Sequence, residues 1–234
     1  MTNASLRLDA APSPKARLDD LSSLYDWRRQ VADLYATVRA LPAVDGWAHW
    51  RNVRDILFRE HEQSPLTRSG RTSFQGLDYF SYDPALRFAV SLDAAFDREP
   101  IHLELGKDGR MTLVPYALTC GLGEALGAEL TLYWVEGYGG GVFLPFGDRT
   151  NGKETFPGGR YLLDTIKSAD LGRLDDGQMI LDFNFAYYPS CAYSEAWVCP
   201  LSPPENRLPV SVRAGERTCL NDGDWRQSGT GLDP

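Results

Sequence analysis

The pattern of apolar positions divides the chain into a helical N-terminal part and a longer β-rich part. Between residues 15 and 41, apolar side chains recur every three or four positions, as on one face of an amphipathic helix. Ser13 and Pro14 suit the N-cap and first turn of this helix, and Pro42 is expected to end it. A second helix is predicted at about residues 46–61. The apolar stripe of the first helix consists of Leu21, Leu24, Tyr25, Val31, Leu34, Tyr35 and Val38.

From Phe74 onward, short apolar runs alternate with turn residues, which is typical of strands joined by tight turns. The Asp-Gly pairs ending at Gly109 and Gly177 predict hairpin connections. Because no helical pattern separates the runs, an antiparallel arrangement is favoured over a parallel α/β sheet. We therefore predict a mainly β, α+β fold: an antiparallel β-barrel or strongly curved sheet capped by the two N-terminal helices. Candidate strands lie at 86–93, 100–105, 110–119, 128–136, 141–146, 160–166, 178–187 and 208–213.

The chain of 234 residues is long enough to bury a core without a disulfide or a metal. We expect a single globular domain over residues 14–217, with helices over 15–61 and β structure over 74–213. Residues 1–13 are small and polar and predict a disordered N-terminus. Residues 218–234 lose the apolar periodicity and predict a loose C-terminal tail.

The charge of the chain bears on its partners. It has 32 acidic and 24 basic residues, a formal net charge of −8, which opposes binding to nucleic acid or to an anionic membrane. No apolar run approaches the roughly 18 residues of a membrane span, and the first residues lack the apolar core of a signal peptide. We expect a cytoplasmic protein with a small-molecule ligand, no nucleic-acid or membrane partner and an oligomeric state that the sequence leaves open.

Cysteine chemistry is open to two interpretations. Seven residues separate Cys191 from Cys199, which is not a structural zinc spacing, so we expect no metal and no cofactor. Cys191 follows Pro189 in an irregular segment and is a candidate thiolate nucleophile, if His61 or Arg160 lowers its pKa. The alternative is a buried, inert thiol. The four cysteines are Cys120, Cys191, Cys199 and Cys219.

Two glycine-rich runs are interpreted as connections. The run from Gly121 to Gly127 departs from the nucleotide-binding pattern and leaves no room for a helix that would present its N-terminus to phosphate, so a turn is predicted. Gly139 to Gly141 lack the ending of a phosphate-binding loop and predict a hairpin connection.

Polar residues concentrate between residues 143 and 216. Arg160 begins a predicted strand, and a guanidinium directed into a barrel needs a carboxylate or an anionic ligand; Asp182 and Glu216 are its expected partners. Asp148 and Thr150 lie in a polar turn whose side chains either bond the turn's own amides or face a ligand. Strand alternation would place Asp182, Asn184 and Ala186 on one face, either inside the barrel or toward solvent.

Five sequence motifs together resemble a known family. They are HEQSPL at 61–66, FQGLDYFSYDP at 74–84, LPFGDRTNGKETFPGGRYL at 144–162, LDFNFAYYPSCAY at 181–193 and CPLSPPENRLPVSVRAGE at 199–216. In this order they resemble the domain of unknown function 1684 family of uncharacterised bacterial and archaeal proteins, over roughly residues 46–217. The resemblance implies no activity. It implies that the family's signature positions are Asp148, Thr150, Gly159, Arg160, Tyr161, Asp182, Asn184, Pro189, Cys191, Tyr193, Cys199, Pro200, Glu205, Asn206, Gly215 and Glu216. Tyr188 and Phe156 depart from it, standing where the family tends to show Asn and Tyr.

Three hypotheses of function follow. The first is a cofactor-independent enzyme, a hydrolase or an isomerase or cyclase, acting on a small organic molecule in a polar barrel pocket. The second is a non-catalytic barrel that binds a small molecule, and the third is a buried polar network with a purely structural role. The candidate catalytic residues are Asp182, Glu216 and Cys191. The candidate substrate-binding residues are Arg160, Asn184, Tyr161, Tyr193, Asp148, Thr150, Glu205 and Asn206.

Overall fold

The structure is a computed structural model that describes residues 13–94, 98–106 and 109–218. The predicted disordered N-terminus and loose C-terminal tail therefore lie outside the described residues, apart from Ser13 and Thr218. The first two residues of the turn predicted at 107–109 also lie outside them.

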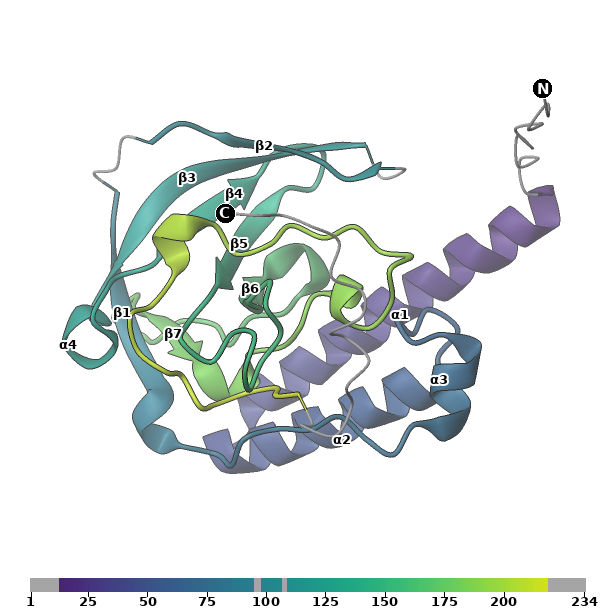
Figure 1. The fold of residues 1–234 in the computed structure, drawn as a ribbon, viewed down its shortest axis with the longest axis horizontal. Helices are drawn as coiled ribbons and strands as arrows, with labels where there is room; N and C mark the ends of the chain where they lie inside the picture. Colours follow the sequence, from purple (N-terminus) through teal and green to yellow (C-terminus); the bar gives the residue numbers. More distant parts are fainter. Residues whose placement is uncertain (1–12, 95–97, 107–108, 219–234) are drawn as a thin grey trace, which may run out of the picture.

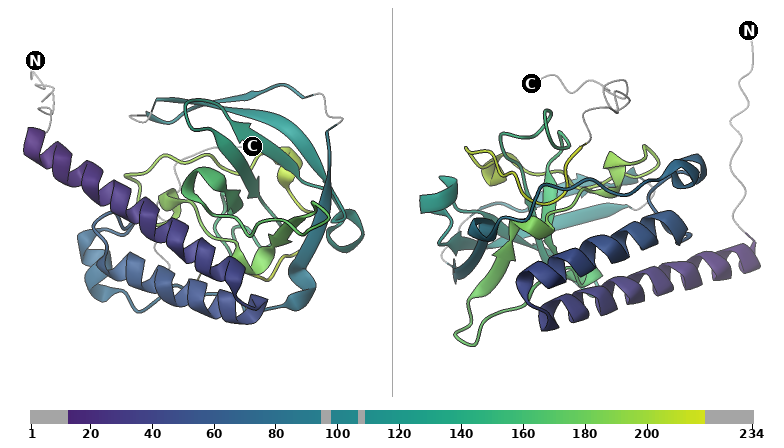
Figure 2. Two further views of the ribbon diagram at one scale, coloured as in Figure 1. Left: turned by 180° about the vertical axis from the view of Figure 1, so that it is seen from behind. Right: turned by 90° about the horizontal axis from the view of Figure 1, so that it is seen from below.

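Two helices form one side of the molecule, as predicted. Helix α1 spans Pro14–Ala40, and the Ser13 hydroxyl accepts a hydrogen bond from the Ala16 amide at 3.2 Å, so Ser13 is the N-cap. Helix α2 spans Ala43–Glu60 and begins earlier than predicted, directly after Pro42. Figures 1 and 2 show the two helices side by side against the strands. The short helix α3, Arg68–Ser73, follows. Across the described ranges, no helix is both long and apolar enough to cross a membrane.

Only the C-terminal half of α1 contributes to the core. Leu34 and Val38 are buried, whereas Leu18, Leu21 and Tyr25 are exposed. Figure 1 shows the N-terminal half of α1 extending beyond the strands. The apolar stripe predicted along the whole helix is therefore covered only where α1 meets α2 and the barrel.

The strands form one antiparallel sheet that curls into a nearly closed barrel, as predicted. The path is β6-β5-β4-β3-β1-β7, and β2 pairs with β3 outside it. Tyr161 of β6 and Tyr187, beyond the end of β7, exchange two backbone hydrogen bonds of 2.8 and 3.1 Å, which nearly closes the barrel. The strands are β1 Arg87–Asp93, β2 Ile101–Glu104, β3 Arg110–Cys120, β4 Thr131–Val135, β5 Gly141–Phe146, β6 Arg160–Asp164 and β7 Met179–Asp182.

Two of the predicted strands differ from the structure. The run at 178–187 ends as a strand at Asp182, because the Asp182 carboxylate accepts a hydrogen bond from the Asn184 amide and the chain enters the 3-10 helix η4, Phe183–Phe185. The segment 208–213 belongs to no strand of the sheet. The other short helices are η1 Pro84–Leu86, α4 Gly123–Leu126, η3 Thr165–Lys167, η5 Ser190–Ala192 and η6 Pro204–Asn206.

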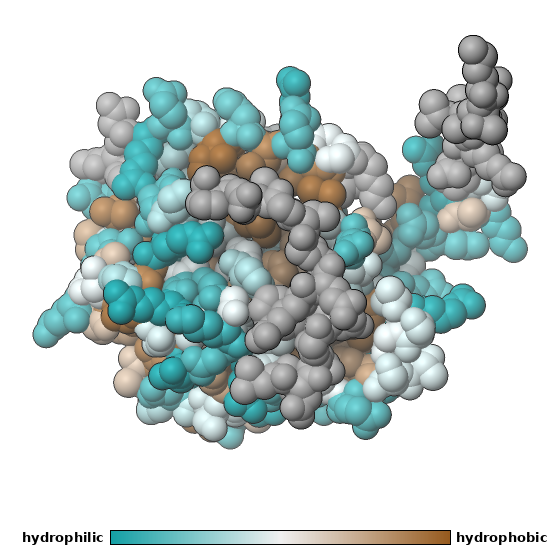
Figure 3. All heavy atoms as spheres, in the orientation of Figure 1, coloured by the Kyte–Doolittle hydropathy of each residue, from teal (hydrophilic) through white to brown (hydrophobic). Residues whose placement is uncertain are grey.

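Three apolar clusters fill the molecule. The first lies within the barrel and includes Val90, Leu132 and Phe183, while the second joins Trp50 of α2 to the barrel at Phe185. Figure 3 shows hydrophobic side chains gathered on one face, at the end of the barrel where β2 and β3 lie in Figure 1. The third cluster consists of buried Leu113, Tyr133, Val135, Phe143 and Tyr161, packed against partly exposed Ile101, Leu103, Met111 and Tyr187.

Candidate functional site

Arg160, the first residue of β6, makes a fully buried ion pair with Asp148. The Nη2 to Oδ2 distance is 2.7 Å, and both side chains are 0% exposed. The guanidinium also lies over the ring of Phe146, 5.0 Å from its centroid. The carboxylate partner of Arg160 is therefore Asp148. The expected partners were Asp182 and Glu216, and neither of their carboxylates pairs with Arg160.

The remaining donors of Arg160 bind the main chain of the C-terminal segment. Nη2 donates to the carbonyl of Val212 at 2.8 Å, and Nη1 donates to the carbonyls of Ala214 and, at 3.3 Å, Glu216. These carbonyls are two residues apart, so they face the same side of an extended segment. The segment predicted as a strand lies outside the sheet and is held by this guanidinium together with two backbone bonds to the turn after β5, Leu208 N to Gly147 O at 2.8 Å and Arg149 N to Val210 O at 3.0 Å. Nε of Arg160 has no partner among the described residues.

Two glycines allow this close approach of backbones. Gly159 has φ +89° and Gly215 has φ +74°, the left-handed region that glycine tolerates best. A Cβ atom would lie 2.5 Å from the Phe146 carbonyl oxygen at Gly159 and 2.5 Å from the Ala186 carbonyl oxygen at Gly215. The two signature glycines are therefore explained by packing around Arg160.

Asp148 and Thr150 belong to a self-contained turn. The second oxygen of Asp148 accepts the Thr150 amide at 2.7 Å and the Val212 amide at 3.3 Å. The Thr150 and Thr155 hydroxyls are 2.7 Å apart and buried. These bonds occupy the polar atoms of the turn and leave Thr150 no exposed surface for a ligand.

Glu216 is the centre of a second buried cluster. Its carboxylate accepts Arg54 Nη2 of α2 at 2.8 Å, the Tyr188 amide at 3.1 Å and the Tyr193 hydroxyl. Burial raises the pKa of Glu216, and Arg54 and Tyr193 offset part of this rise. Arg54 Nε also donates to the Tyr79 hydroxyl at 3.1 Å. The Glu216 carboxyl is thus a buried acid of raised pKa, and Arg54 is its ionic partner.

Asp182 is the centre of a third cluster, separate from both others. Arg87 donates to its Oδ2 at 3.0 Å, while the Asn184 amide and side chain donate to its Oδ1 at 3.0 and 2.8 Å. The Asn184 side chain also bonds the main chain of Asp83 through both of its polar atoms. Asp182 and Asn184 therefore fix the end of β7 to the segment before β1.

Glu205 and Asn206, neighbours in η6, have different roles. Asn206 is fully buried and bonds Thr131 N and O and Pro145 O at 2.8 Å each, which links η6 to β4 and β5. The Glu205 side chain is 24% exposed and accepts the Tyr133 hydroxyl at 2.8 Å. Arg98 lies 3.7 Å from the same oxygen. Glu205 therefore places a partly exposed carboxylate at the edge of the third apolar cluster.

Tyr161 and the two neighbouring cysteines lie on another side of that cluster. The Tyr161 hydroxyl donates to the Pro200 carbonyl at 2.6 Å, and its ring packs against Phe143, 4.7 Å between centroids. The Cys191 amide donates to Cys199 Sγ at 3.4 Å. Both cysteines are partly exposed and neither is in a disulfide. His61 does not contact Cys191; it lies at the end of α2 with Nε2 3.2 Å from Asp26 Oδ2.

The structure thus distributes the sequence-predicted residues over several sites. It brings together Arg160 with Asp148, Asp182 with Asn184, and Glu216 with Tyr193, but the three acidic side chains accept from three different arginines. Sequence reasoning missed Arg54 and Arg87. Arg54 follows the α2 core residue Trp50 by four positions, so helical periodicity placed it on the buried face, where an arginine needs a carboxylate.

The glycine run at 121–127 forms a turn and the short helix α4, and its amides hold a carboxylate of the chain itself. The amides of Gly121, Leu122 and Gly123 donate to Glu129 Oε1 at 3.0, 2.9 and 2.7 Å, and Thr119 Oγ1 donates to Oε2 at 2.6 Å. Burial opposes ionisation, but these bonds together lower the pKa of Glu129. Backbone amides that would suit a phosphate are therefore already occupied.

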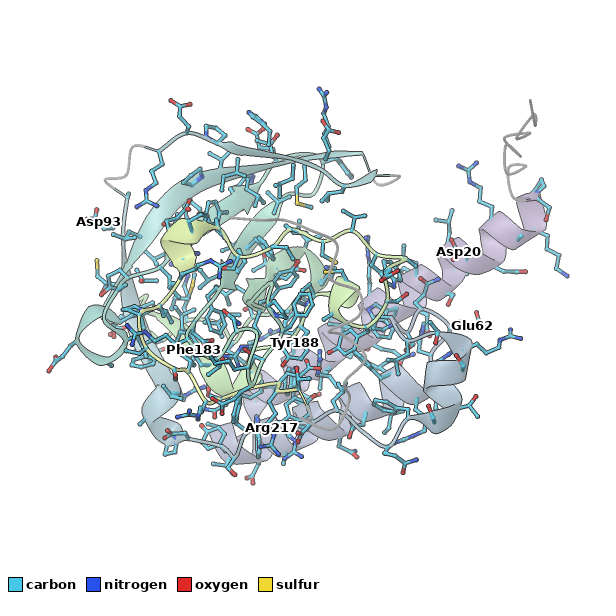
Figure 4. The ribbon with its side chains drawn as sticks, in the orientation of Figure 1. Asp20, Glu62, Asp93, Phe183, Tyr188 and Arg217 are labelled. Atoms are coloured by element: carbon cyan, nitrogen blue, oxygen red, sulfur yellow. The ribbon has the colours of Figure 1, made fainter. Side chains whose placement is uncertain are left out.

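The two departures from the family pattern are neighbours in the fold. The rings of Phe156 and Tyr188 are 6.0 Å apart, and Tyr188 Oη lies 3.0 Å from Thr218 Oγ1. Tyr188 is buried, and Figure 4 labels it near the centre of the view. Phe156 and Tyr188, which stand where the family tends to show Tyr and Asn, thus pack their rings against each other.

A surface depression of about 530 Å³ lies between α1 and the end of α2. Its lining includes Asp19, Asp26, Glu60 and Glu62, together with His61. It contains none of the residues that the sequence predicted for a site. Over the described part of the chain, no group of three or more His, Cys, Asp or Glu side chains is arranged to hold a metal ion.

Comparison with known proteins identifies relatives without assigning a function. The model of a family described as "Protein of unknown function (DUF1684)" matches residues 72–217. Among solved structures, the chain is similar to an uncharacterised protein from Haloarcula marismortui, determined in solution by NMR. The two have 35% sequence identity and a TM-score of 0.51, and the match covers 73% of this chain and 91% of that chain. No curated protein matches.

Proposed function

The chain belongs to the DUF1684 family, and we propose that it binds a small organic molecule at the apolar end of its barrel. The observation that supports this proposal is the third apolar cluster. Ile101, Leu103 and Met111, on the inner face of the β2–β3 hairpin, remain partly exposed against a floor of buried aromatic and aliphatic side chains. Partly exposed apolar side chains over a rigid aromatic floor are typical of binding sites for small organic molecules.

The polar groups at the edge of this cluster indicate the class of ligand. Glu205 presents a partly exposed carboxylate, whose Oε1 accepts the Tyr133 hydroxyl at 2.8 Å. A molecule with an aliphatic or aromatic body and a hydrogen-bond donor at one end matches this arrangement. We propose Glu205 as the ligand-facing polar residue, and the ring of buried Tyr161 as part of the floor. Arg160, Asp148, Thr150 and Asn206, whose side chains are fully buried and bonded to the chain itself, are then the frame of the site.

A binding experiment with a neutral naphthalene dye such as Prodan tests this function. We expect saturable fluorescence enhancement with the intact chain. Leu103→Asp should weaken dye affinity about tenfold or more, because it places a charge among the half-buried apolar side chains that would contact the dye. His102→Asp is the matched control, because His102 is the adjacent, outward-facing residue of the same strand, and it should leave affinity unchanged.

The outcome also depends on folding, so both variants are first compared with the intact chain by circular dichroism and thermal unfolding. Equal dye affinity for the two folded variants would contradict the proposal, as would the absence of saturable binding to the intact chain. Native mass spectrometry after gentle purification would in addition reveal a co-purified molecule.

The second candidate is the cofactor-independent enzyme, a hydrolase or an isomerase or cyclase, and the raised pKa of Glu216 favours it. A buried carboxyl of raised pKa beside the Tyr193 hydroxyl is a usable acid and base pair. Asp182 and Cys191 would have to act elsewhere, because they lie in separate clusters. Tyr193→Phe keeps the ring that packs on Phe58 and should abolish turnover of any substrate found by screening. Full turnover by this variant would exclude Tyr193 from the chemistry.

A further inference from the structure

Cys191 and Cys199 form a thiol pair that the proposed binding function does not use. Cys191 lies in η5, and its amide donates to Cys199 Sγ at 3.4 Å. Both cysteines are partly exposed, so a small solute reaches them, and neither is bonded to another cysteine. The two residues are signature positions of the resemblance found in the sequence, which assigned them no chemistry.

The surroundings distinguish the two sulfur atoms. The Cys191 thiol is the main cause that lowers the pKa of Cys199 to about 6, and the amides of Cys191 and Ser190 and the charge of Lys167 act in the same direction against burial. The hydrogen bond to Cys199 raises the pKa of Cys191, and burial raises it further. These surroundings favour the thiolate at Cys199, with Cys191 as the protonated partner that donates to it.

We propose that Cys199 and Cys191 form a peroxide-reactive dithiol site, in which Cys199 is the attacking residue and Cys191 the resolving one. The Cys199 thiolate attacks the distal oxygen of a hydroperoxide, the O–O bond breaks, and the leaving oxygen takes a proton to give water or an alcohol. Cys199 is then a sulfenic acid. The Cys191 sulfur loses its proton and attacks Cys199 Sγ, the S–O bond breaks, and the second oxygen leaves as water. The two thiols supply the two electrons that reduce the peroxide.

The product is a disulfide that closes a loop between η5 and Cys199. The seven residues inside this loop include Trp197 and Val198, and Val198 lies near Gly106 at the tip of the β2–β3 hairpin. Oxidation would therefore restrict the segment beside the apolar cluster. The reaction itself does not depend on a ligand in that cluster.

The experiment uses the full chain with Cys120→Ser and Cys219→Ser, so that Cys191 and Cys199 are the remaining cysteines. This chain is treated with hydrogen peroxide or with cumene hydroperoxide, in separate arms, and followed by mass spectrometry after alkylation. We expect one intramolecular disulfide, with a loss of two hydrogen atoms. Adding Cys191→Ser should instead accumulate a sulfenic acid at Cys199 that dimedone traps.

A matched control retains Cys120 as the sole cysteine, exposed at the last position of β3. Its oxidation should be at least about tenfold slower than that of Cys199. Reaction with either peroxide supports the site. Three outcomes overturn it: no disulfide with both peroxides, oxidation of Cys199 no faster than that of Cys120, or sulfenic acid forming on Cys191 in the Cys199→Ser chain as fast as on Cys199. Circular dichroism of each reduced variant confirms that the compared chains are folded.

Discussion

Arg160 orders the C-terminal segment through one side chain. Its guanidinium binds Asp148 and the carbonyls of Val212, Ala214 and Glu216, all in the interior. A planar group with five donors directs several bonds at once, whereas an ammonium is a single point of charge. The identity of the residue, and not only its charge, therefore determines this part of the attachment of the segment.

The first prediction concerns this arginine. Arg160→Met should lower the free energy of unfolding by about 3–5 kcal/mol, because it leaves Asp148 as an uncompensated buried charge. Arg160→Lys should recover only part of this loss. Urea unfolding measures both. Arg213→Met is the control, because its ion pair with Glu154 is solvent-exposed and should leave stability nearly unchanged. A folded Arg160→Met protein of undiminished stability would contradict the structural role.

The second prediction concerns Glu216 and pH. Its pKa is raised above the ordinary 4.5, so the folded state binds this proton more tightly than the unfolded chain. The stability that the protonated form contributes is complete below about pH 4.5 and is lost as pH rises through the folded pKa. Glu216→Gln does not titrate, so its stability relative to the intact chain should increase as pH rises above about 4.5. A difference independent of pH would mean that the carboxyl is not shifted.

At the scale of the elements, α1 has two parts with different environments. Its C-terminal half packs on α2 and the barrel through Leu34, Tyr35 and Val38, whereas Leu18, Leu21 and Tyr25 lie on the exposed half. The same periodic pattern runs through both halves, so periodicity predicted the helix but not the extent of its contact.

The third prediction follows from this division. Leu34→Ala should cost about 2–5 kcal/mol of unfolding free energy, because it leaves a cavity in the core. Leu21→Ala, the same substitution on the exposed N-terminal half of α1, should change the unfolding free energy by no more than about 0.5 kcal/mol. Thermal and urea unfolding of the two variants give the comparison. A large loss for Leu21→Ala would indicate that the exposed half of α1 is covered by a partner.

Strand prediction succeeded where a neighbouring strand supplies the hydrogen bonds. The runs that became β1, β3 and β5 were located within one or two residues. The run at 178–187 was cut short by the Asp182 side chain. The run at 208–213 is held by Arg160 and by backbone bonds to the turn after β5, outside the sheet. Alternation of apolar residues predicts an extended backbone, but it does not predict which groups form hydrogen bonds with that backbone.

At the scale of the whole molecule, the sequence predicted the antiparallel barrel or curved sheet with its two N-terminal helices. It also predicted the family. It located the polar residues but not their pairing. Arg160 was expected to meet Asp182 or Glu216, and its partner is Asp148, twelve residues earlier in the chain. Each expected acid instead pairs with an arginine of another element, Arg87 or Arg54. Pairing depends on how the elements pack, which a single sequence does not contain.

The barrel is nearly closed by a short contact. Two backbone hydrogen bonds join Tyr161 and Tyr187, whereas β3 and β4 pair over a long register. Tyr161 also contacts the cluster formed by Leu113, Tyr133 and Phe143, and its hydroxyl bonds Pro200. The apolar end of the barrel, the thiol pair and the closing contact therefore lie together, next to the strand that Arg160 begins.

The attachment of the C-terminal segment on several sides also affects how the protein is degraded. Besides the bonds from Arg160, residues 215–218 bond through the backbone to the segment before β1, to the segment after η4 and to Glu154, and the Glu216 carboxylate binds Arg54. Proteases act on backbone that detaches in partial openings. Because these contacts must break together, we expect proteolytic cuts within residues 212–218 only when the barrel itself opens.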